Sequence, residues 1–331
     1  MLKSEGYTPI IICRLNSRIQ EEAIKLELVV KCVGFRNALD IASMLRLAAL
    51  LRTYQPIAVI CHSGHDADLS SLTVRLLSAL RLLKNRPTLL RMRTYLPSKA
   101  KAFGYNLMFD QSFTPSRALR EQLLRNRKIN SDKVGALYPG IDFKKMRSDA
   151  DAPLPIDLQQ RLRSHKNAKV VLHVAMLRGE KGHAFMLQVI EELLNEFPNL
   201  LYVIAGEGYL REQLMQMTDE KMLQEAVCFL GMVNPVAPVI KNADVLVMPS
   251  TYEPLGMSQI EALGLGVPVI VSDTGGLPEI VIHNQTGQIC PVLGEADSKA
   301  KWVEALSLYL SNPNLAKQHA EQGRQRVTEQ I

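Results

Sequence analysis

The chain has 331 residues, of which 47% are hydrophobic and 22% are charged. These fractions exclude a disordered chain, a collagen and a disulfide scaffold, and at roughly 150 residues per domain the length indicates two globular domains. The five cysteines are scattered and form no C-x-x-C pair, which indicates reduced thiols in the cytosol. No apolar run reaches about 18 residues, so we expect no transmembrane helix and only peripheral membrane contact.

Positive charge is concentrated in one segment of the chain. Residues 75–133 hold 14 lysines and arginines against three acids, a net charge of +11, whereas the whole chain carries +6. Such a segment suits an anionic partner such as a phospholipid headgroup, a phosphorylated acceptor or nucleic acid, and an ordinary solvated face is the alternative. The segment has no zinc finger, no RNA-recognition motif and no interleaved aromatics, so we expect no nucleic-acid partner.

Short apolar runs alternate with amphipathic stretches along the chain, which is typical of parallel α/β proteins. In the first half, the pattern predicts strands at 8–14, 28–33, 57–61, 89–93, 112–114 and 134–137, and helices at 37–54, 67–84 and 116–127. A polar, proline-containing stretch at 146–159 is the expected domain boundary.

The second half repeats this alternation. The predicted strands are 169–175, 200–205, 226–229, 245–248, 267–271 and 288–290, and the predicted helices are 183–196, 209–217, 258–263, 299–310 and 313–321. Several of these strands are nearly continuous Val, Ile and Leu runs, as expected where both faces of a sheet are covered. Ligands of such sheets bind at the carboxyl ends of the strands, where the polar and glycine-rich segments of this chain lie.

The most informative segment runs from 249 to 281. Glu253 follows a predicted strand, and Glu261 lies on the helix that begins near Met257. Gly256 permits close backbone approach, and a helix N-terminus carries partial positive charge that favours phosphate. An anionic group flanked by two carboxylates that read hydroxyls is the outline of a nucleotide diphosphate sugar. The alternative is that both glutamates are surface charges.

Two further segments follow predicted strands. Arg178 and Lys181, with Gly179 and Gly182 interspersed, follow the strand at 169–175. Two cations at that place can clamp a diphosphate; a solvated basic turn is the alternative. The GEG at 206–208 follows the next strand. It lacks the third glycine and the later acidic residue of a dinucleotide fingerprint, so it is weak evidence for NAD.

Together these segments resemble the retaining GT-B glycosyltransferases of family four (group 1). The resemblance covers about residues 2–327, and the Glu253-x7-Glu261 element, the Arg178/Lys181 pair, GEG and TGGLPEIV at 274–281 occur in the family's order and spacing. It implies an α/β protein of two Rossmann-like parallel-sheet domains facing a central cleft. Residues 1–145 would be the acceptor-side domain and residues 146–331 the nucleotide-sugar-binding domain.

The resemblance also implies roles for individual residues. Arg178, Lys181 and Glu253 would be the catalytic set: the two cations neutralise the donor diphosphate, and Glu253 contacts the donor hexose. Glu261 would hydrogen-bond the ribose hydroxyls. The donor-binding set comprises Gly206, Glu207, Gly208, Gly256, Met257, Ser258 and Glu261.

In the first half, the resemblance implies an acceptor side. RMRTY at 91–95 falls where many members carry a histidine near the reacting sugar, and Arg93 occupies that place. His62, after a predicted strand, is the alternative. YPGID at 138–142 resembles the family's hinge. The family's first strand, glycine-rich loop and final crossing helix have no counterpart, so the sequence looks trimmed at both ends.

We therefore expect transfer of a hexose-type sugar from a nucleotide diphosphate sugar to an acceptor hydroxyl, with retention and without a metal or other cofactor. The basic segment favours an anionic or membrane-associated acceptor, such as a glycolipid or lipopolysaccharide core, at the inner face of the cytoplasmic membrane. The alternative is a trimmed, inactive chain that still binds nucleotide. A nicotinamide-dependent oxidoreductase is disfavoured, because no G-x-G-x-x-G follows a predicted strand.

Overall fold

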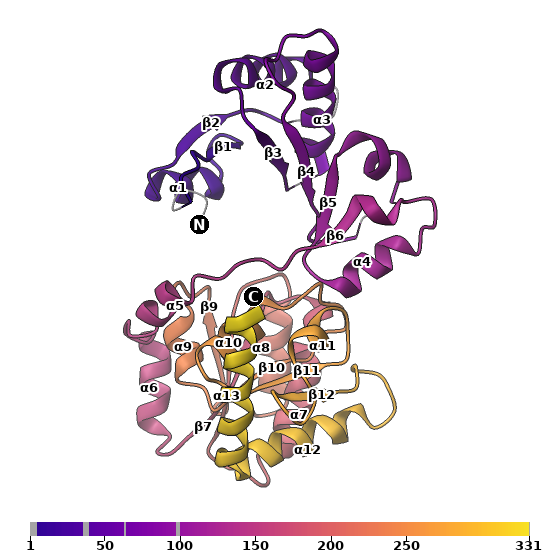
Figure 1. The fold of residues 1–331 in the computed structure, drawn as a ribbon. Coiled ribbons are helices and arrows are strands. Elements are labelled where there is room, and N and C mark those ends of the chain that lie inside the picture. The colour runs from indigo at the N-terminus through magenta and orange to yellow at the C-terminus, as the bar shows by residue number, and fades with distance from the viewer. Residues whose placement is uncertain (1–4, 36–39, 63, 97–99, 331) are drawn as a thin grey trace. The chain divides into compact units, whose positions relative to one another are not determined.

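A computed structural model describes residues 5–35, 40–62, 64–96 and 100–330 (Figure 1). The chain forms two units. The first comprises Met1–Pro115 and Arg120–Leu137, and the second comprises Ser116–Leu119 and Tyr138–Ile331. Every named strand pairs in parallel with its neighbours, so each unit has the parallel α/β architecture that the sequence predicts.

The first unit contains two parallel sheets, one with the order β1-β2 and one with the order β3-β4-β5-β6. Its strands are β1 (Ile10–Cys13), β2 (Val29–Cys32), β3 (Ala58–Cys61), β4 (Thr88–Met92), β5 (Gln111–Thr114) and β6 (Val134–Ala136). Its helices are α1 (Arg18–Lys25), α2 (Ile41–Tyr54), α3 (Gly64–Ala79) and most of α4 (Arg117–Leu124), with a π-helical turn at Gly104–Met108 and a 3-10 turn at Ser131–Lys133.

The second unit is a doubly wound sheet with the order β12-β11-β10-β7-β8-β9. Its strands are β7 (Lys169–Val174), β8 (Leu200–Ala205), β9 (Val227–Gly231), β10 (Val245–Met248), β11 (Val269–Ser272) and β12 (Gln288–Cys290). Its helices are α5 (Phe143–Asp149), α6 (Ile156–Ser164), α7 (His183–Leu193), α8 (Arg211–Glu220), α9 (Ala237–Lys241), α10 (Met257–Gly264), α11 (Leu277–Ile280), α12 (Ser298–Ser311) and α13 (Pro313–Gln330), with a 3-10 turn at Gly179–Lys181.

Both faces of the second sheet are buried, which explains its continuous apolar strands. All six residues of β8 are buried. Successive side chains of a strand point to opposite faces. Tyr202 accordingly belongs to the core cluster that includes residues of α7 and α12, and Val203 to the cluster that includes residues of α10 and α13. The strand pattern of this half therefore follows from burial on two sides.

Helix boundaries differ more from the predictions. The stretch 146–159, expected as the domain boundary, contains the end of α5 and the start of α6, and the main segment of the second unit already begins at Tyr138. Leu158 is buried in the core of the second unit, so this polar stretch belongs to that unit. Helix α13 runs beyond 321 because Val327 is buried and Gly323 lies directly against Leu263 of α10. Of the helix predicted at 37–54, residues 37–39 lie outside the described residues.

Candidate functional site

The strand order of the second sheet reverses between two neighbouring strands. From β7 the chain winds outward through β8 and β9, and from β10 it winds the other way through β11 and β12. In doubly wound sheets, ligands bind at the carboxyl ends of the strands at such a switch point. The loops after β7 and β10 carry Arg178, Lys181 and Glu253, so the topology brings these three predicted residues to one place.

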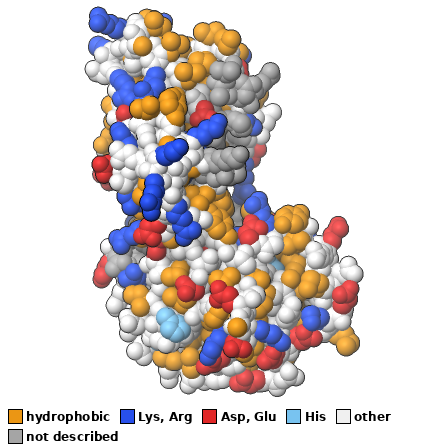
Figure 2. Space-filling view, turned by 90° about the vertical axis from the view of Figure 1, so that its right-hand side faces the viewer, with side chains coloured by type: hydrophobic (Ala, Val, Ile, Leu, Met, Phe, Trp, Pro, Cys, Tyr) orange, Lys and Arg blue, Asp and Glu red, His pale blue; other side chains and the backbone are white. Residues whose placement is uncertain are grey.

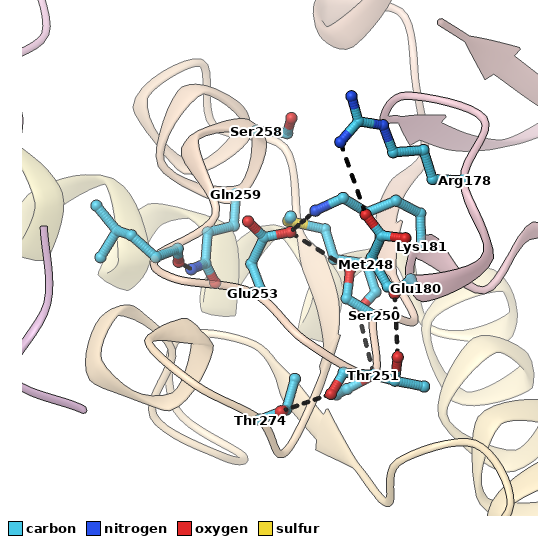
Figure 3. A network of polar contacts seen from close by, with 12 residues as sticks. Arg178, Glu180, Lys181, Met248, Ser250, Thr251, Glu253, Ser258, Gln259 and Thr274 are labelled. Atoms are coloured by element: carbon cyan, nitrogen blue, oxygen red, sulfur yellow. Dashed lines mark hydrogen bonds and ion pairs between the residues drawn. The ribbon is translucent and has the colours of Figure 1, made fainter. Parts of the chain in front are cut away.

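A buried ion pair joins the two loops. The Lys181 Nζ donates to Glu253 Oε2 at 2.6 Å, and the two side chains are only 12% and 11% exposed. The Ser250 hydroxyl also donates to Glu253 Oε2, at 3.4 Å. Figure 3 shows the Lys181 ammonium turned toward the Glu253 carboxylate. Because the pair is withdrawn from water, its attraction is screened less than that of a surface pair.

Glycines allow the loops to approach this closely. Gly182 has a φ of +75° and Gly275 a φ of +54°, both in the left-handed region. A Cβ on Gly182 would overlap the carbonyl oxygen of Pro249, and a Cβ on Gly275 would overlap that of Glu253. The Gly276 N–H donates to the Glu253 carbonyl at 3.0 Å. Glu253 is thus fixed by its backbone as well as by its side chain.

Arg178 lies in the same loop but is less constrained. Its side chain is 42% exposed, and its ion pair with Glu180 spans 4.0 Å. A pair that long at a surface contributes little stability. In Figure 3, the side chains of Arg178 and Lys181 leave their loop in the direction of Glu253 and Ser258. The guanidinium is therefore available to an anionic ligand at little cost.

The start of α10 is attached to the end of β7. Gly256, at a φ of +88°, precedes the first helical residue Met257, and the Ser258 hydroxyl donates to the Val174 carbonyl at 3.0 Å. The first amides of a helix have no partner within the helix and carry partial positive charge. The predicted donor-binding residues at 256–258 therefore form an anion-favouring helix end at the switch point.

Glu261 lies one turn further along α10. Its side chain is half-buried, and burial raises the pKa of its carboxyl group. The Glu261 carboxylate has no hydrogen bond or ion pair with any described residue. Nearby, the Gln259 amide donates to the Leu255 carbonyl at 2.6 Å, while its buried Oε1 has no described partner. These acceptor oxygens are suited to hydroxyl donors from a ligand.

The GEG turn after β8 packs against the loop after β7. A Cβ on Gly206 or Gly208 would overlap the carbonyl oxygens of Ala175 and Leu177 respectively. The Leu177 N–H donates to the Glu207 carbonyl at 3.0 Å, and the Glu207 side chain pairs with Arg211 at 3.0 Å. The three glycine-containing loops thus form one continuous assembly.

Sequence reasoning missed a histidine pair beneath the Lys181 loop. His173 of β7 and His183 of α7 stack with ring centroids 4.0 Å apart, and His173 Nδ1 lies 2.7 Å from the Tyr202 hydroxyl. Burial, together with Lys181, lowers the pKa of His183 to about 4 and that of His173 well below its usual range. The histidine two residues after Lys181 was the available signal, but its partner on β7 becomes visible only through the fold.

We expect His183 to make the second unit sensitive to acid. The pKa of His183 is about 4 in the folded protein, against a reference value of 6.5. The contribution of neutral His183 to the free energy of unfolding is therefore complete above pH 6.5 and decreases as the pH falls toward 4. Lowering the pH from about 7.5 to about 4.5 should reduce the free energy of unfolding by about 2–3 kcal/mol through the protonation of His183. Urea unfolding followed by the fluorescence of the single tryptophan, Trp302, which is buried in the second unit, measures the loss.

His183→Phe is the matched variant, because it keeps a flat ring against His173 and cannot be protonated. Neither ring nitrogen of His183 has a hydrogen-bond partner among the described residues, so phenylalanine removes no hydrogen bond there. The variant should lose less stability between the two pH values than the wild type. An equal loss in both proteins would show that His183 stays uncharged or that another group dominates.

The two residues predicted on the acceptor side lie in the first unit. His62 directly follows β3 and is exposed, and its backbone N–H donates to Asp66 Oδ2 at 3.2 Å. Arg93 follows β4 and is half-buried. Among the described residues, no group of three His, Cys, Asp or Glu side chains could hold a metal ion.

Solved structures share this fold over nearly the whole chain. A glycosyltransferase from Rickettsia africae superposes with a TM-score of 0.82 at 19% identity, covering 99% of this chain and 87% of its own. Anabaena HepE, solved in complex with UDP, gives 0.78 at 16% identity, covering 98% and 89%. The two Rossmann-like units therefore have the GT-B fold.

Sequence comparison gives the family. The family described as glycosyl transferases group 1 matches residues 156–326, which is more than half of the chain. An uncharacterized glycosyltransferase of Methanocaldococcus jannaschii is 33% identical over 179 residues, covering 54% of this chain and 46% of its own. Glycogen synthase of Mycobacterium tuberculosis is 32% identical over 160 residues, 48% of this chain and 38% of its own. The chain belongs to the group 1 glycosyl transferases and spans less than half the length of these two relatives.

Proposed function

We propose that the protein transfers a hexose-type sugar from a nucleotide diphosphate sugar to an acceptor hydroxyl, with retention of configuration. The buried Lys181–Glu253 pair, placed at the switch point between β7 and β10, carries this proposal. Membership of the group 1 glycosyl transferases supports it. The complexes of Anabaena HepE with UDP and with UDP-glucose support a nucleotide-sugar donor.

The arrangement of charges suits a diphosphate leaving group. Arg178, Lys181 and the N-terminus of α10 supply positive charge where the diphosphate would develop negative charge, so the proposed reaction needs no metal. Glu253 holds the Lys181 ammonium in place through one carboxylate oxygen. In the proposed reaction, its other carboxylate oxygen would contact the hexose. In the front-face reaction that the family resemblance implies, the leaving phosphate takes the acceptor proton and no protein nucleophile is required.

The acceptor is proposed to be anionic or membrane-associated, such as a glycolipid or a lipopolysaccharide core. The net charge of +11 between residues 75 and 133 supports this. Figure 2 shows more Lys and Arg than Asp and Glu on the visible face of the first unit, at the top of the view. No described helix is long and apolar enough to cross a membrane. Peripheral attachment at the inner face of the cytoplasmic membrane is therefore our proposal for its location.

Arg178→Ala should reduce the rate of sugar transfer by about 10²–10³, or roughly 2–4 kcal/mol of transition-state stabilisation. The reason is that this exposed guanidinium has only a 4.0 Å contact with Glu180 and is free to bind the leaving diphosphate. The measurement is kcat/KM for sugar transfer from UDP-, GDP- and ADP-sugars. Arg163→Ala removes an exposed arginine of α6 and is the matched control. An unchanged kcat/KM in Arg178→Ala would contradict the assigned role.

The same nucleotides separate the proposal from its alternative. An active enzyme should gain melting temperature with its nucleotide and also transfer sugar. A chain that binds nucleotide but is inactive should show the thermal shift and no transfer to any acceptor. Hydrolysis of a glycoside in the absence of nucleotide would contradict both.

A further inference from the structure

Four polar side chains gather in the interior of the first unit, outside the donor-binding residues. Arg91 of β4 pairs in register with Ser112 of β5, so their side chains lie on the same face of the sheet. Arg93 directly follows β4, and its N–H donates to the Phe113 carbonyl at 2.7 Å, so the pairing with β5 continues and places Arg93 on the same face as Arg91. Tyr105, in the π-helical turn after β4, lies against both guanidinium groups, at 5.3 Å and 5.9 Å from its ring centroid.

The described residues do not balance the charges of this cluster. Arg91 is 5% exposed, and its guanidinium is also 5.0 Å from the ring centroid of Phe109. Arg91 forms an ion pair with Asp68, at 3.9 Å, and the Asp68 side chain is 59% exposed. Burial and the neighbouring Arg93 lower the pKa of Arg91. Among the described residues, the long contact with Asp68 is the one ion pair of these two adjacent cations, and a buried charge needs a partner.

The hydrogen bonds of the cluster are equally incomplete. Arg91 Nε, Arg93 Nε, the Tyr105 hydroxyl and the Ser112 hydroxyl have no partner among the described residues. They are the only buried side-chain N and O atoms without a partner in the described part of the first unit. All four can donate, and buried donors are rarely left unpaired in folded proteins.

We propose that the cluster of Arg91, Arg93, Tyr105 and Ser112 is a binding site for a phosphate group. Guanidinium groups bind phosphate oxygens in pairs of hydrogen bonds. A phosphate monoester is mostly dianionic near neutral pH and offers three strong acceptor oxygens to these donors. Arg93 is half-buried, whereas Arg91 is buried, so a phosphate group would enter the site beside Arg93 and then contact Arg91.

In the context of the proposed function, this site gives the acceptor a chemical class. The acceptor would carry a phosphate, either on a sugar or on a lipid, and the site would hold it in the first unit. Only this identification of the ligand as acceptor rests on the proposed transferase activity. The binding of phosphate itself is independent of the donor residues, all of which belong to the second unit.

Calorimetric titration of the full chain with glycerol 3-phosphate tests the site. Arg93→Gln should weaken binding at least about tenfold, since a lost charged hydrogen bond has at least that effect. Tyr105→Phe, which removes only a hydroxyl, should weaken it less, and Arg93→Lys should retain part of the affinity. Arg127→Gln removes an exposed charge from the same unit and should bind as the wild type does. UDP affinity should be the same in all of these proteins.

A second arm identifies the source of the phosphate. Vesicles of phosphatidylcholine with phosphatidic acid are compared with vesicles that carry oleic acid at equal charge. Competition with glycerol 3-phosphate by the phosphatidic acid vesicles alone supports a lipid phosphate, whereas no competition supports a soluble phosphorylated acceptor. Equal competition by both kinds of vesicle would overturn the site, because it would then respond to charge alone.

Two other results would also overturn the proposal: no binding of glycerol 3-phosphate or phosphatidic acid to the wild type, or unchanged binding to Arg93→Gln. If Arg93→Gln also loses UDP affinity, the substitution disturbs the whole chain. The Tyr105→Phe variant then tests the site, and unchanged phosphate binding in that variant would count against the proposal. A chain that binds phosphate in this manner but neither binds nucleotide nor transfers sugar would refute the proposed function and leave the phosphate site standing.

Discussion

Lys181→Met is expected to destabilise the second unit by about 3–5 kcal/mol, the usual cost of removing one partner of a buried ion pair. The substitution leaves the Glu253 carboxylate, 11% exposed, with only the 3.4 Å contact from Ser250. It should also reduce sugar transfer by about 10²-fold or more, because a cation that offsets the leaving diphosphate is lost. Urea unfolding followed by Trp302 fluorescence measures the first effect and kcat/KM the second.

The double variant Lys181→Met with Glu253→Gln distinguishes folding from catalysis. It removes both charges, so no uncompensated carboxylate stays buried, and most of the lost stability should return. Transfer should stay as low as in the single variant, because neither functional group is restored. A double variant that is as unstable as Lys181→Met would show that the ion pair is not the source of the effect.

Gly182→Ala is expected to destabilise the second unit by about 3–4 kcal/mol, through backbone strain and steric overlap together. At a φ of +75° any side chain is strained, and the new Cβ would also overlap the carbonyl oxygen of Pro249. Relief of the overlap must move the loop after β7 away from the loop after β10. The Lys181–Glu253 pair spans these two loops, so transfer should fall as well. Unfolding curves and kcat/KM are the measurements.

Gly266 is a matched control for this substitution. It has the same φ of +75°, but a Cβ there meets no atom within 4 Å. Gly266→Ala should therefore show only the strain, about 1–2 kcal/mol, with sugar transfer unchanged. Equal destabilisation by the two alanines would mean that the close approach of Gly182 to Pro249 does not matter.

The strands of the second unit were predictable because burial on both faces leaves a direct mark in the sequence. The strands expected at 200–205, 245–248 and 288–290 have those bounds in the structure. Helix limits were harder. The end of α13 depends on Gly323 fitting against Leu263, a contact between residues 60 positions apart that no local pattern reveals.

The candidate site was predictable in part for a related reason. Polar and glycine-rich segments after apolar strands have to lie at the carboxyl edge of a parallel sheet, which locates Arg178, Lys181 and Glu253 in general terms. The sequence does not give the strand order, however. Only the adjacency of β7 and β10 makes Lys181 and Glu253, which are 72 positions apart, partners at 2.6 Å.

The two clusters that the sequence alone did not bring together have the same explanation. His173 and His183 are stacked because β7 and α7 pack together, and Arg91 meets Ser112 because β4 and β5 pair in one register. The amino-acid sequence by itself determined the alternation of strands and helices, the family and the loops that carry charge, since these depend on local composition and order. The tertiary structure alone decided which charges are paired and which stay unbalanced, because pairing depends on distances between segments far apart in the chain.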